Sequence, residues 1–163
     1  MDNKIKNAIK IINKIEYMNI ASITPDGLPW NTPVYAAFDK KLNFYSLSWK
    51  KNQHSVNINN NPNVFITIYD STVPAGTGVG IYFSGKTKEL SDPKEIIVGL
   101  IYIYKRSKHK MRAIREFLKS FPRRVYRFTP EKAWINGDSD INGNVIDIRT
   151  EIDLKKLKKC FFT

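Results

Sequence analysis

Short strand-forming segments joined by tight turns dominate the first half of the chain, and this pattern constrains the fold more than any other feature. Residues 19–24 form an apolar segment that ends at Pro25-Asp26-Gly27. This tripeptide favours a tight turn, because proline presets φ and glycine accepts a positive φ. A second segment, at about 28–38, turns at 39–41 into a third at 42–48. Strands in hairpin succession pair antiparallel, so the sequence predicts an antiparallel sheet.

Helical patterns and further strands surround this sheet. Apolar residues recur every three or four positions over 3–16, which predicts an amphipathic helix. Pro62 ends a short helix that begins after Asn52. Ser91 or Asp92 caps a third helix that has Pro93 in its first turn and runs to about residue 104. A fourth helix is expected over 110–119, and strands are expected at 63–69, 81–90, 124–128 and 132–136.

These elements together predict an α+β fold, mainly antiparallel, with about six to seven strands closed into a small barrel and helices flanking it. The 163 residues suffice for one compact domain, which we expect to span residues 1–163. Residues 137–144 are rich in turn formers and predict a loop. Residues 152–162 fit either a short helix or a strand, so 137–163 is a C-terminal extension whose structure the pattern leaves open.

The location of the protein can be inferred from what the chain lacks. The longest apolar stretch, at 96–104, is nine residues long, whereas a bilayer-spanning helix needs about 20. Lysines interrupt the first 14 residues, so no signal peptide is expected. Cys160 is the single cysteine and cannot form an internal disulfide. We therefore expect a cytoplasmic protein with no membrane partner.

The net charge of +12 suggests a phosphate-bearing partner such as a nucleic acid. Most of the excess lies at 100–132, where eleven Lys and Arg residues face only Glu116 and Glu131, a net charge of +9. The segment 105–127 is either a docking surface for an acidic partner or a solvated helix face. The aromatic residues around it have apolar neighbours, which favours packing over base stacking and makes nucleic acid the less favoured partner.

Few residues fit a recognised catalytic pattern. The two histidines, His54 and His109, are far apart in sequence, and no cluster has metal-ligand spacing, so no metal site is expected. No Ser-His-Asp arrangement on a marked turn and no glycine-rich phosphate motif is present. The sequence assigns no catalytic residue.

A polar turn before the short helix is the most informative segment. It combines hydroxyl, ammonium, amide and imidazole groups where helix N-terminal amides favour an anion. A bound phosphate and a solvated lysine turn that caps the helix both fit this composition. The residues concerned are Ser46, Ser48, Lys50, Lys51, Asn52, Gln53, His54 and Ser55.

Several short runs, in order and spacing, carry a family resemblance. They are residues 20–29, Thr32-Pro33-Val34, Phe44-Tyr45-Ser46, His54-Ser55, Asn57-Ile58, Asn61-Pro62, residues 70–82 and residues 126–135. Over about residues 5–136 the chain resembles the pyridoxamine 5′-phosphate oxidase-like proteins, a split-barrel family that binds flavin mononucleotide (FMN). The resemblance implies a homodimer of split barrels with flavin at the subunit interface.

The resemblance also implies where the flavin lies. The backbone of Asn31, Thr32, Pro33 and Val34 would follow the isoalloxazine ring, and Ser46 and Ser48 would face the ribityl chain and phosphate. The family places Arg or Lys where this chain has Gln53 and His54. Lys50 and Lys51 are the candidates to compensate, since a lysine ammonium can approach from a nearby position. Tyr82 and Trp134 fit either flavin stacking or core packing.

The implied function is that of an FMN-binding oxidoreductase that acts on a small-molecule substrate. Residues 137–163 lack the Arg, His and Trp arrangement of true pyridoxamine 5′-phosphate oxidases, which argues against that specific reaction. Two alternatives stay open: a non-catalytic module that binds flavin, haem or a deazaflavin, and a nucleic-acid-binding protein that uses the basic segment 105–127.

Overall fold

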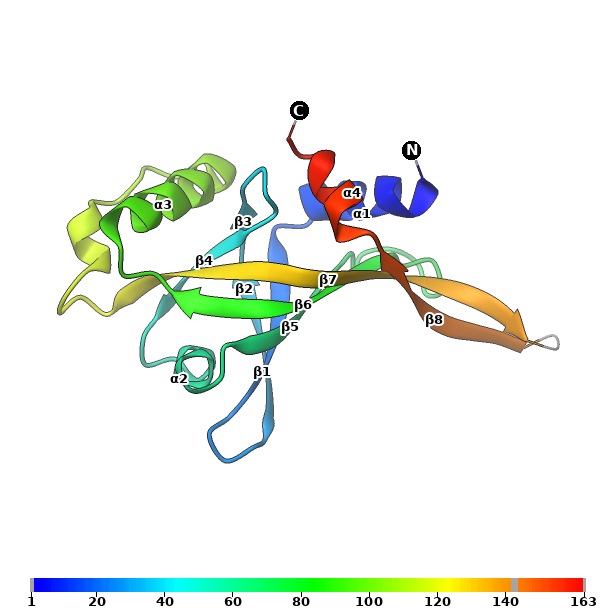
Figure 1. Ribbon diagram of the computed structural model, residues 1–163, viewed down its shortest axis with the longest axis horizontal. Helices are drawn as coiled ribbons and strands as arrows, with labels where there is room; N and C mark the ends of the chain where they lie inside the picture. Colours follow the sequence, from blue (N-terminus) through cyan, green and yellow to red (C-terminus); the bar gives the residue numbers. More distant parts are fainter. Residues whose placement is uncertain (1, 142–143, 163) are drawn as a thin grey trace.

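One curled antiparallel sheet organises the chain (Figure 1). The computed structural model describes residues 2–141 and 144–162, and over these the spatial strand order is β2-β1-β5-β6-β7-β4-β3, with β8 paired to β7. This confirms the predicted α+β split-barrel class, with eight strands among the described residues. The strands are β1 (Tyr17–Ile23), β2 (Pro29–Tyr35), β3 (Ala37–Phe38), β4 (Phe44–Trp49), β5 (Asn63–Tyr69), β6 (Gly80–Glu89), β7 (Arg123–Ile141) and β8 (Asn144–Ile152).

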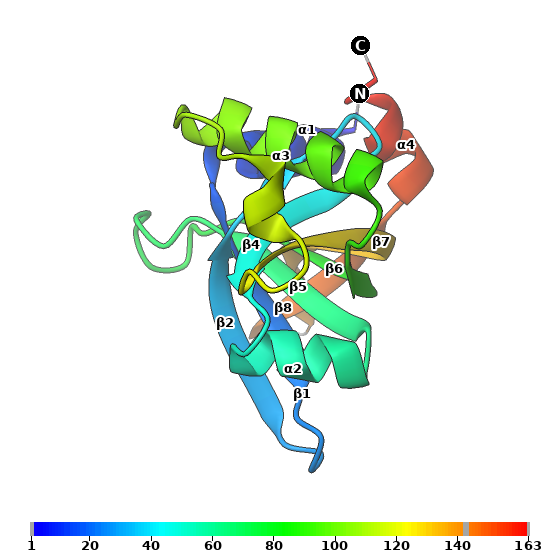
Figure 2. The same ribbon diagram turned by 90° about the vertical axis from the view of Figure 1, so that its left-hand side faces the viewer.

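Helices flank the sheet on two sides. In Figures 1 and 2, α1 (Asn3–Lys14), α3 (Pro93–Ser107) and α4 (Leu154–Lys159) gather on one side and α2 (Gln53–Asn60) lies on the opposite side. The carboxylates of Asp2, Asp92 and Asp153 accept hydrogen bonds from the first-turn amides of α1, α3 and α4, respectively. No helix in the described part of the chain is both long and apolar enough to span a bilayer.

Two apolar clusters fill the fold. The larger occupies the inside of the curled sheet, where the rings of Phe83 and Phe128 lie 5.4 and 6.1 Å from that of Phe44. The smaller holds α3 against β4 and β7 and includes Tyr45, Leu100, Phe117 and Val125. At Gly99 the helix comes so close to the sheet that a Cβ atom would lie 2.8 Å from Val125. A side chain there would force the helix outward.

The sheet does not close into a full barrel. The strand β2 is hydrogen-bonded to β1 only, while β4 pairs with β7 and β3. The curl of the sheet nevertheless brings β2 beside β4 (Figure 2). Within the described residues, the barrel is therefore split between these two strands.

The predicted helix over 110–119 is wrong. The helix α3 ends at Ser107, because Lys108 adopts a left-handed conformation with φ of 58°. Only Ile114–Phe117 follows as a single 3-10 turn, called η1. In this segment cations and apolar residues alternate without the three- and four-residue spacing of an amphipathic helix. Phe117 is its one buried residue, so packing on the core stabilises a single turn rather than a whole helix.

The prediction of two strands at 124–128 and 132–136 and a loop at 137–144 is also wrong. A single strand, β7, runs from Arg123 to Ile141, and a β-bulge between Ser84 and Gly85 of β6 accommodates Pro130. The described residues of the predicted loop instead form the end of β7 and the first residue of β8, which pair as a hairpin, and residues 142 and 143 lie outside the described residues. The tail after Ile152 adopts the helical alternative, α4.

Candidate functional site

The strands β2 and β4 and the helix α2 meet at the split in the barrel (Figure 2). The four predicted ring-contacting residues, 31–34, all lie on β2. Val34 points into the core, whereas Asn31 and Pro33 are exposed. Because β2 pairs on one side only, its other edge presents backbone N–H and C=O groups toward the split.

A buried polar cluster joins the end of β4 to the first turn of α2. His54 Nε2 and Ser48 Oγ share a hydrogen bond of 2.6 Å. Ser48 Oγ also accepts hydrogen bonds from Asn52 Nδ2 at 3.0 Å and from Ser55 Oγ at 3.2 Å. Ser48, His54 and Ser55 are all buried. Burial lowers the pKa of His54 and so favours its neutral form.

A second, separate chain of side-chain hydrogen bonds joins α2 to β1 through Asn57. The Gln53 side chain donates to Asn57 Oδ1 at 2.8 Å, and Asn57 Nδ2 donates to Ser22 Oγ at 3.0 Å. Sequence reasoning did not assign Asn57 or Ser22 a role. No sequence signal indicated this role, because the need of Asn57 for hydrogen-bond partners comes from its complete burial beside the core residue Ile58, which only the structure shows.

Positive charge lies at the surface of the same turn. Lys50 and Lys51 are exposed, and neither forms an ion pair with a described residue. Ser46 is buried two residues before Ser48 on the same face of β4. The turn therefore offers two free ammonium groups at the start of α2, over a layer of buried hydroxyl groups.

A groove of about 710 Å³ opens beside the split. Its walls include Tyr35, which follows Val34 at the end of β2, and Leu47, which lies between Ser46 and Ser48 on β4. The Tyr35 hydroxyl is buried without a hydrogen-bond partner among the described residues, and burial, with the charge of Glu16, raises its pKa. The lining residues are Glu16, Tyr17, Tyr35, Leu47, Ile103, Tyr104, Ser107, His109, Lys110 and Arg112.

The chemistry of these groups fits FMN. The phosphate dianion matches the free ammonium groups of Lys50 and Lys51 and the amide end of α2, which has eight residues. The flat ring matches the free backbone edge of β2 and the tyrosine-lined groove next to it. At the two positions where the family has cations, His54 is held inside the polar cluster and the exposed Gln53 donates to Asn57, so both position the turn rather than add charge to it.

Other residues singled out in the sequence lie away from the split. Tyr82 and Trp134 are outside the barrel core, on the outer face of the sheet, where both rings lie near Phe65 at 6.2 and 5.9 Å. The glycine-rich loop before β6 is tied to β7, because Gly80 N donates to Asn136 Oδ1 at 2.6 Å and Asn136 Nδ2 donates to Gly78 O at 2.9 Å. Among the described residues, no hydrogen bond joins Tyr82, Trp134 or the glycine-rich loop to β4 or α2.

Part of the basic segment is used inside the protein. Arg106 donates to the carbonyls of Ile12 and Ile15. Arg124 and Arg127 form ion pairs with Glu89 and Glu95 at 2.9 and 2.7 Å. Arg112 is exposed and pairs with Glu116 at 3.0 Å. The other exposed cations of the segment are Lys105, Lys108, Lys110, Arg115 and Lys119.

Comparison with known proteins assigns this arrangement to a family. A family model described as pyridoxamine 5′-phosphate oxidase matches residues 5–137. No match was found among curated proteins. A crystal structure from Bacteroides thetaiotaomicron, of a protein named for a proposed role in 5-nitroimidazole antibiotic resistance, is similar with a TM-score of 0.66 at 14% identity, over 82% of this chain and 84% of that one.

Two further solved structures show the same fold. A haem-binding protein from Mycobacterium smegmatis has a TM-score of 0.70 at 11% identity, over 98% of this chain and 61% of that one. A protein from Listeria innocua, named provisionally as a pyridoxamine 5′-phosphate oxidase, has a TM-score of 0.61 at 18% identity, over 80% of this chain and 96% of that one. At these identities the structures establish the fold alone.

Proposed function

The chain belongs to the pyridoxamine 5′-phosphate oxidase family, and on that premise we propose that it is an FMN-binding flavoprotein that acts as an oxidoreductase on a small-molecule substrate. One observation carries this proposal. The free edge of β2, the cationic turn before α2 and the groove meet at the split in the barrel. Ring, ribityl chain and phosphate each find a chemically matched surface within this one region.

Each part of the region has a separate task. Lys50 and Lys51 hold the phosphate by charge, and the Ser48–His54–Ser55 cluster fixes the turn that carries them. The backbone of 31–34 orients the ring. When bound, FMN supplies the redox chemistry at its ring, while the protein positions the ring and tunes it with nearby hydrogen bonds and charges.

The groove beside the split is the candidate substrate site. Tyr17, Tyr35 and Tyr104 give it flat apolar walls, and Lys110 and Arg112 give it positive charge. A small aromatic molecule that carries an anionic group fits this lining. The buried hydroxyl of Tyr35 has no partner among the described residues, and a hydrogen bond to such a ligand would satisfy it.

A second copy of the chain is the proposed partner at this site. Three large apolar side chains border the split on different elements, and each is about half exposed: Trp30 at 45%, Trp49 at 53% and Val56 at 41%. Exposed apolar groups gathered around one site mark an interaction surface. A homodimer would cover them and place the flavin at the subunit interface.

The absorbance spectrum of the freshly purified protein, with a titration of the cofactor-free protein with FMN, tests the proposal. Flavin absorption bands, saturable FMN binding and reduction of the bound flavin by a nicotinamide cofactor are expected. A protein that is colourless and does not bind added FMN would overturn the flavoprotein assignment. Binding without turnover across a panel of reductants and acceptors would instead show a non-catalytic module.

Haem is the second candidate ligand, because one observation favours it. The groove contains the imidazole of His109, which could ligate iron, beside Lys110 and Arg112, which could pair with the haem propionates. The fold is shared with a haem-binding protein. A haem titration separates the two ligands: a Soret shift that is lost in His109→Ala, without FMN binding, would replace the flavin assignment.

A further inference from the structure

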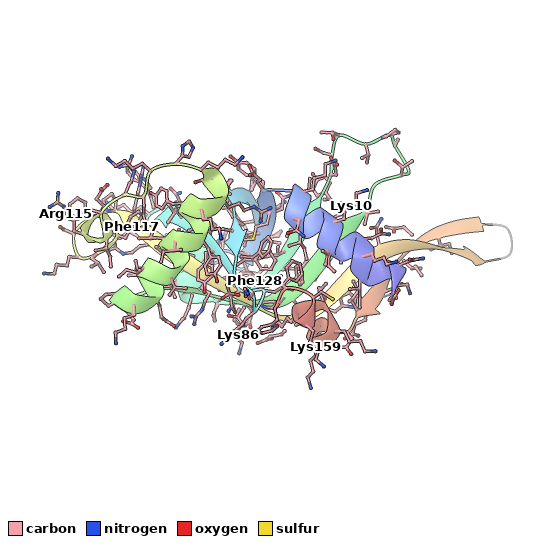
Figure 3. All side chains as sticks on the ribbon, turned by 90° about the horizontal axis from the view of Figure 1, so that it is seen from above. Lys10, Lys86, Arg115, Phe117, Phe128 and Lys159 are labelled. Atoms are coloured by element: carbon pink, nitrogen blue, oxygen red, sulfur yellow. The ribbon has the colours of Figure 1, made fainter. Side chains whose placement is uncertain are left out.

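Three helices, α1, α3 and α4, form one layer on the same side of the sheet (Figures 1 and 2). Seen from above, they lie next to one another across this side (Figure 3). The Phe38 ring on β3 holds them together, because its centre lies 4.9 Å from the guanidinium of Arg106 on α3 and 5.4 Å from the ring of Phe161, which follows α4. Arg106 also donates to the carbonyls of Ile12 and Ile15 at the end of α1. The three helices therefore present one continuous surface, which we call the helical face.

The helical face carries most of the positive charge of the protein. Its helices and their capping residues, 2–14, 92–108 and 153–159, contain twelve Lys and Arg against four Asp and Glu, a net charge of +8 out of +12. On the opposite side lie α2 and the turn of the β1–β2 hairpin (Figure 1). Residues 17–35 and 53–60, which form these elements, contain one carboxylate and no Lys or Arg. This distribution favours a partner that presents an extended negative surface to one side of the protein.

The carboxylates of the helical face are already engaged within the protein. Three of them are the aspartates that cap α1, α3 and α4, and the fourth, Glu95, pairs with Arg127 at 2.7 Å and with Lys88 at 3.2 Å. By contrast, each helix has exposed lysines that form no ion pair with a described residue. They include Lys6 and Lys10 on α1, Lys94 and Lys105 on α3, and Lys155 and Lys156 on α4. These ammonium groups are free to contact an anionic partner.

Exposed aliphatic side chains lie between the lysines of α3. The inner apolar residues of this helix pack in the smaller core cluster. Ile97, Val98 and Ile101 point away from that cluster and are 40%, 43% and 50% exposed. Spacings of three and four residues place Lys94 and Lys105 at the two ends of the same row, which we call the α3 stripe. A helix that is apolar on both faces is normally covered on both, and the described residues cover only one face of α3.

The composition of the helical face distinguishes between classes of partner. The cores of protein–protein interfaces are depleted of lysine and enriched in aromatic residues and arginine. Binding to the phosphates of a nucleic acid is electrostatic and makes no use of exposed aliphatic side chains. Lysines around an exposed aliphatic row are instead typical of helices that lie in the headgroup region of an anionic bilayer. Three helices in one layer also suit a partner that is flat.

We propose that the helical face docks on an anionic lipid bilayer, with the α3 stripe inserted at the interface and the lysines of α1, α3 and α4 against lipid phosphates. A contact of this kind needs no membrane-spanning helix. The expectation of no membrane partner rested on the lack of a spanning segment and of a signal peptide, so it does not address a surface contact. The contact uses no residue assigned to the flavin site and is therefore tested separately from the proposed function.

Co-sedimentation of the full chain with lipid vesicles tests the proposal. We expect binding to phosphatidylcholine vesicles that contain about 30% phosphatidylserine, and binding at least about tenfold weaker to pure phosphatidylcholine. Raising the salt concentration from about 0.1 M to about 0.5 M should weaken the binding, because salt screens the attraction between the lysines and the lipid phosphates. Absence of binding to the anionic vesicles, or equal binding to both kinds of vesicle, would overturn the proposal.

Two substitutions in the α3 stripe test the aliphatic contact. Ile97→Ser/Ile101→Ser should weaken binding to the anionic vesicles at least about tenfold, because less apolar area enters the bilayer. The matched control, Ile23→Ser/Leu28→Ser, removes side chains that are 41% and 59% exposed on the β1–β2 hairpin, and it should bind as the wild type does. Unchanged binding by the stripe variant would show a partner recognised by charge alone, such as a nucleic acid, and would overturn the proposal.

Charge removal gives an independent readout. Lys6→Gln/Lys10→Gln on α1 should weaken binding to the anionic vesicles about tenfold. Lys50→Gln/Lys51→Gln removes the same charge beside α2, on the opposite side of the protein, and should have little effect on vesicle binding. Equal weakening by both pairs would show a general charge effect and would overturn the helical face as the site of contact. A protein that binds the vesicles but no FMN would overturn the proposed function and leave the bilayer contact in place.

Discussion

The Nε2 atom of His54 lies 2.6 Å from the Oγ atom of Ser48, and this contact joins the last residues of β4 to the first turn of α2. The family resemblance placed His54 where a cation would hold the flavin phosphate. Instead, its ring is 7% exposed and part of a closed polar cluster. In the proposed flavin site, the phosphate would therefore be held by the lysines of the turn, while His54 holds the turn in place.

Removing the His54 ring should destabilise the protein. His54→Ala leaves the Ser48 hydroxyl with one partner fewer in a buried space, which should lower the free energy of unfolding by about 2–3 kcal/mol. Urea unfolding followed by circular dichroism measures the change. His109→Ala is the matched control, since His109 is exposed, and its effect should be below about 0.5 kcal/mol.

Stability should fall at mildly acidic pH because of the same residue. Burial lowers the pKa of His54, so the unfolded chain binds a proton there more readily than the folded chain. The stability that the neutral form of His54 contributes is complete above the pKa of histidine in the unfolded chain, about 6.5, and is lost as the pH falls below it. Urea midpoints measured from about pH 7.5 to pH 5 should show less slope in His54→Gln than in His109→Gln. The reverse order would contradict the assignment.

Sequence patterns correctly predicted those strands and helices whose structure is determined by their own residues. The strand at Asn63–Tyr69 was predicted as found, and the cap of α3 is Asp92, one of the two residues predicted for it. The β7–β8 hairpin was missed because the end of β7 is polar and begins with Gly137, and because Ile146 and Ile148 of β8 are exposed and do not pack on the core. The helix predicted over 110–119 failed for a related reason, because only Phe117 is anchored in the core.

The candidate site was predictable in part. The turn at Ser46–Ser55 is continuous in sequence, so its polar composition was visible at once. The groove could not be predicted from the sequence, because its walls come from β1, β2, β4, α3 and the segment after α3. Only the curl of the sheet brings these elements together. Its unpartnered Tyr35 hydroxyl could not be found from sequence, since burial of that atom depends on all these elements.

Loss of the Tyr35 hydroxyl should not destabilise the protein. Tyr35→Phe removes a buried hydroxyl that has no partner among the described residues, so the free energy of unfolding should stay the same or rise by up to about 1 kcal/mol. Tyr45→Phe is the control, because the Tyr45 hydroxyl donates to Asp39 at 3.0 Å and its loss should cost about 1 kcal/mol. A destabilised Tyr35→Phe would mean that the hydroxyl has a partner in solution.

A side chain at Gly85 should disrupt the sheet. A Cβ atom there would lie 2.2 Å from the carbonyl oxygen of Thr129, at the β-bulge between β6 and β7. Gly85→Ala should therefore lower the free energy of unfolding by at least about 2 kcal/mol, through forced backbone movement. Gly78→Ala is the control, since its nearest contact would be an ordinary 3.6 Å to Val73. Similar melting temperatures for the two variants would contradict the close packing at the bulge.

The lysines of the turn should control flavin affinity without affecting the fold. Lys50→Gln/Lys51→Gln removes both free ammonium groups near α2, and the loss of charged hydrogen bonds to a phosphate should weaken FMN binding about ten- to a hundredfold. Fluorescence titration of the cofactor-free protein measures the affinity. Lys40→Gln/Lys41→Gln removes an equally exposed lysine pair on the β3–β4 turn and should leave the affinity unchanged. Riboflavin, which lacks the phosphate, should bind the wild type and Lys50→Gln/Lys51→Gln equally. If riboflavin binding falls as much as FMN binding, the lysines support the turn instead of contacting the phosphate.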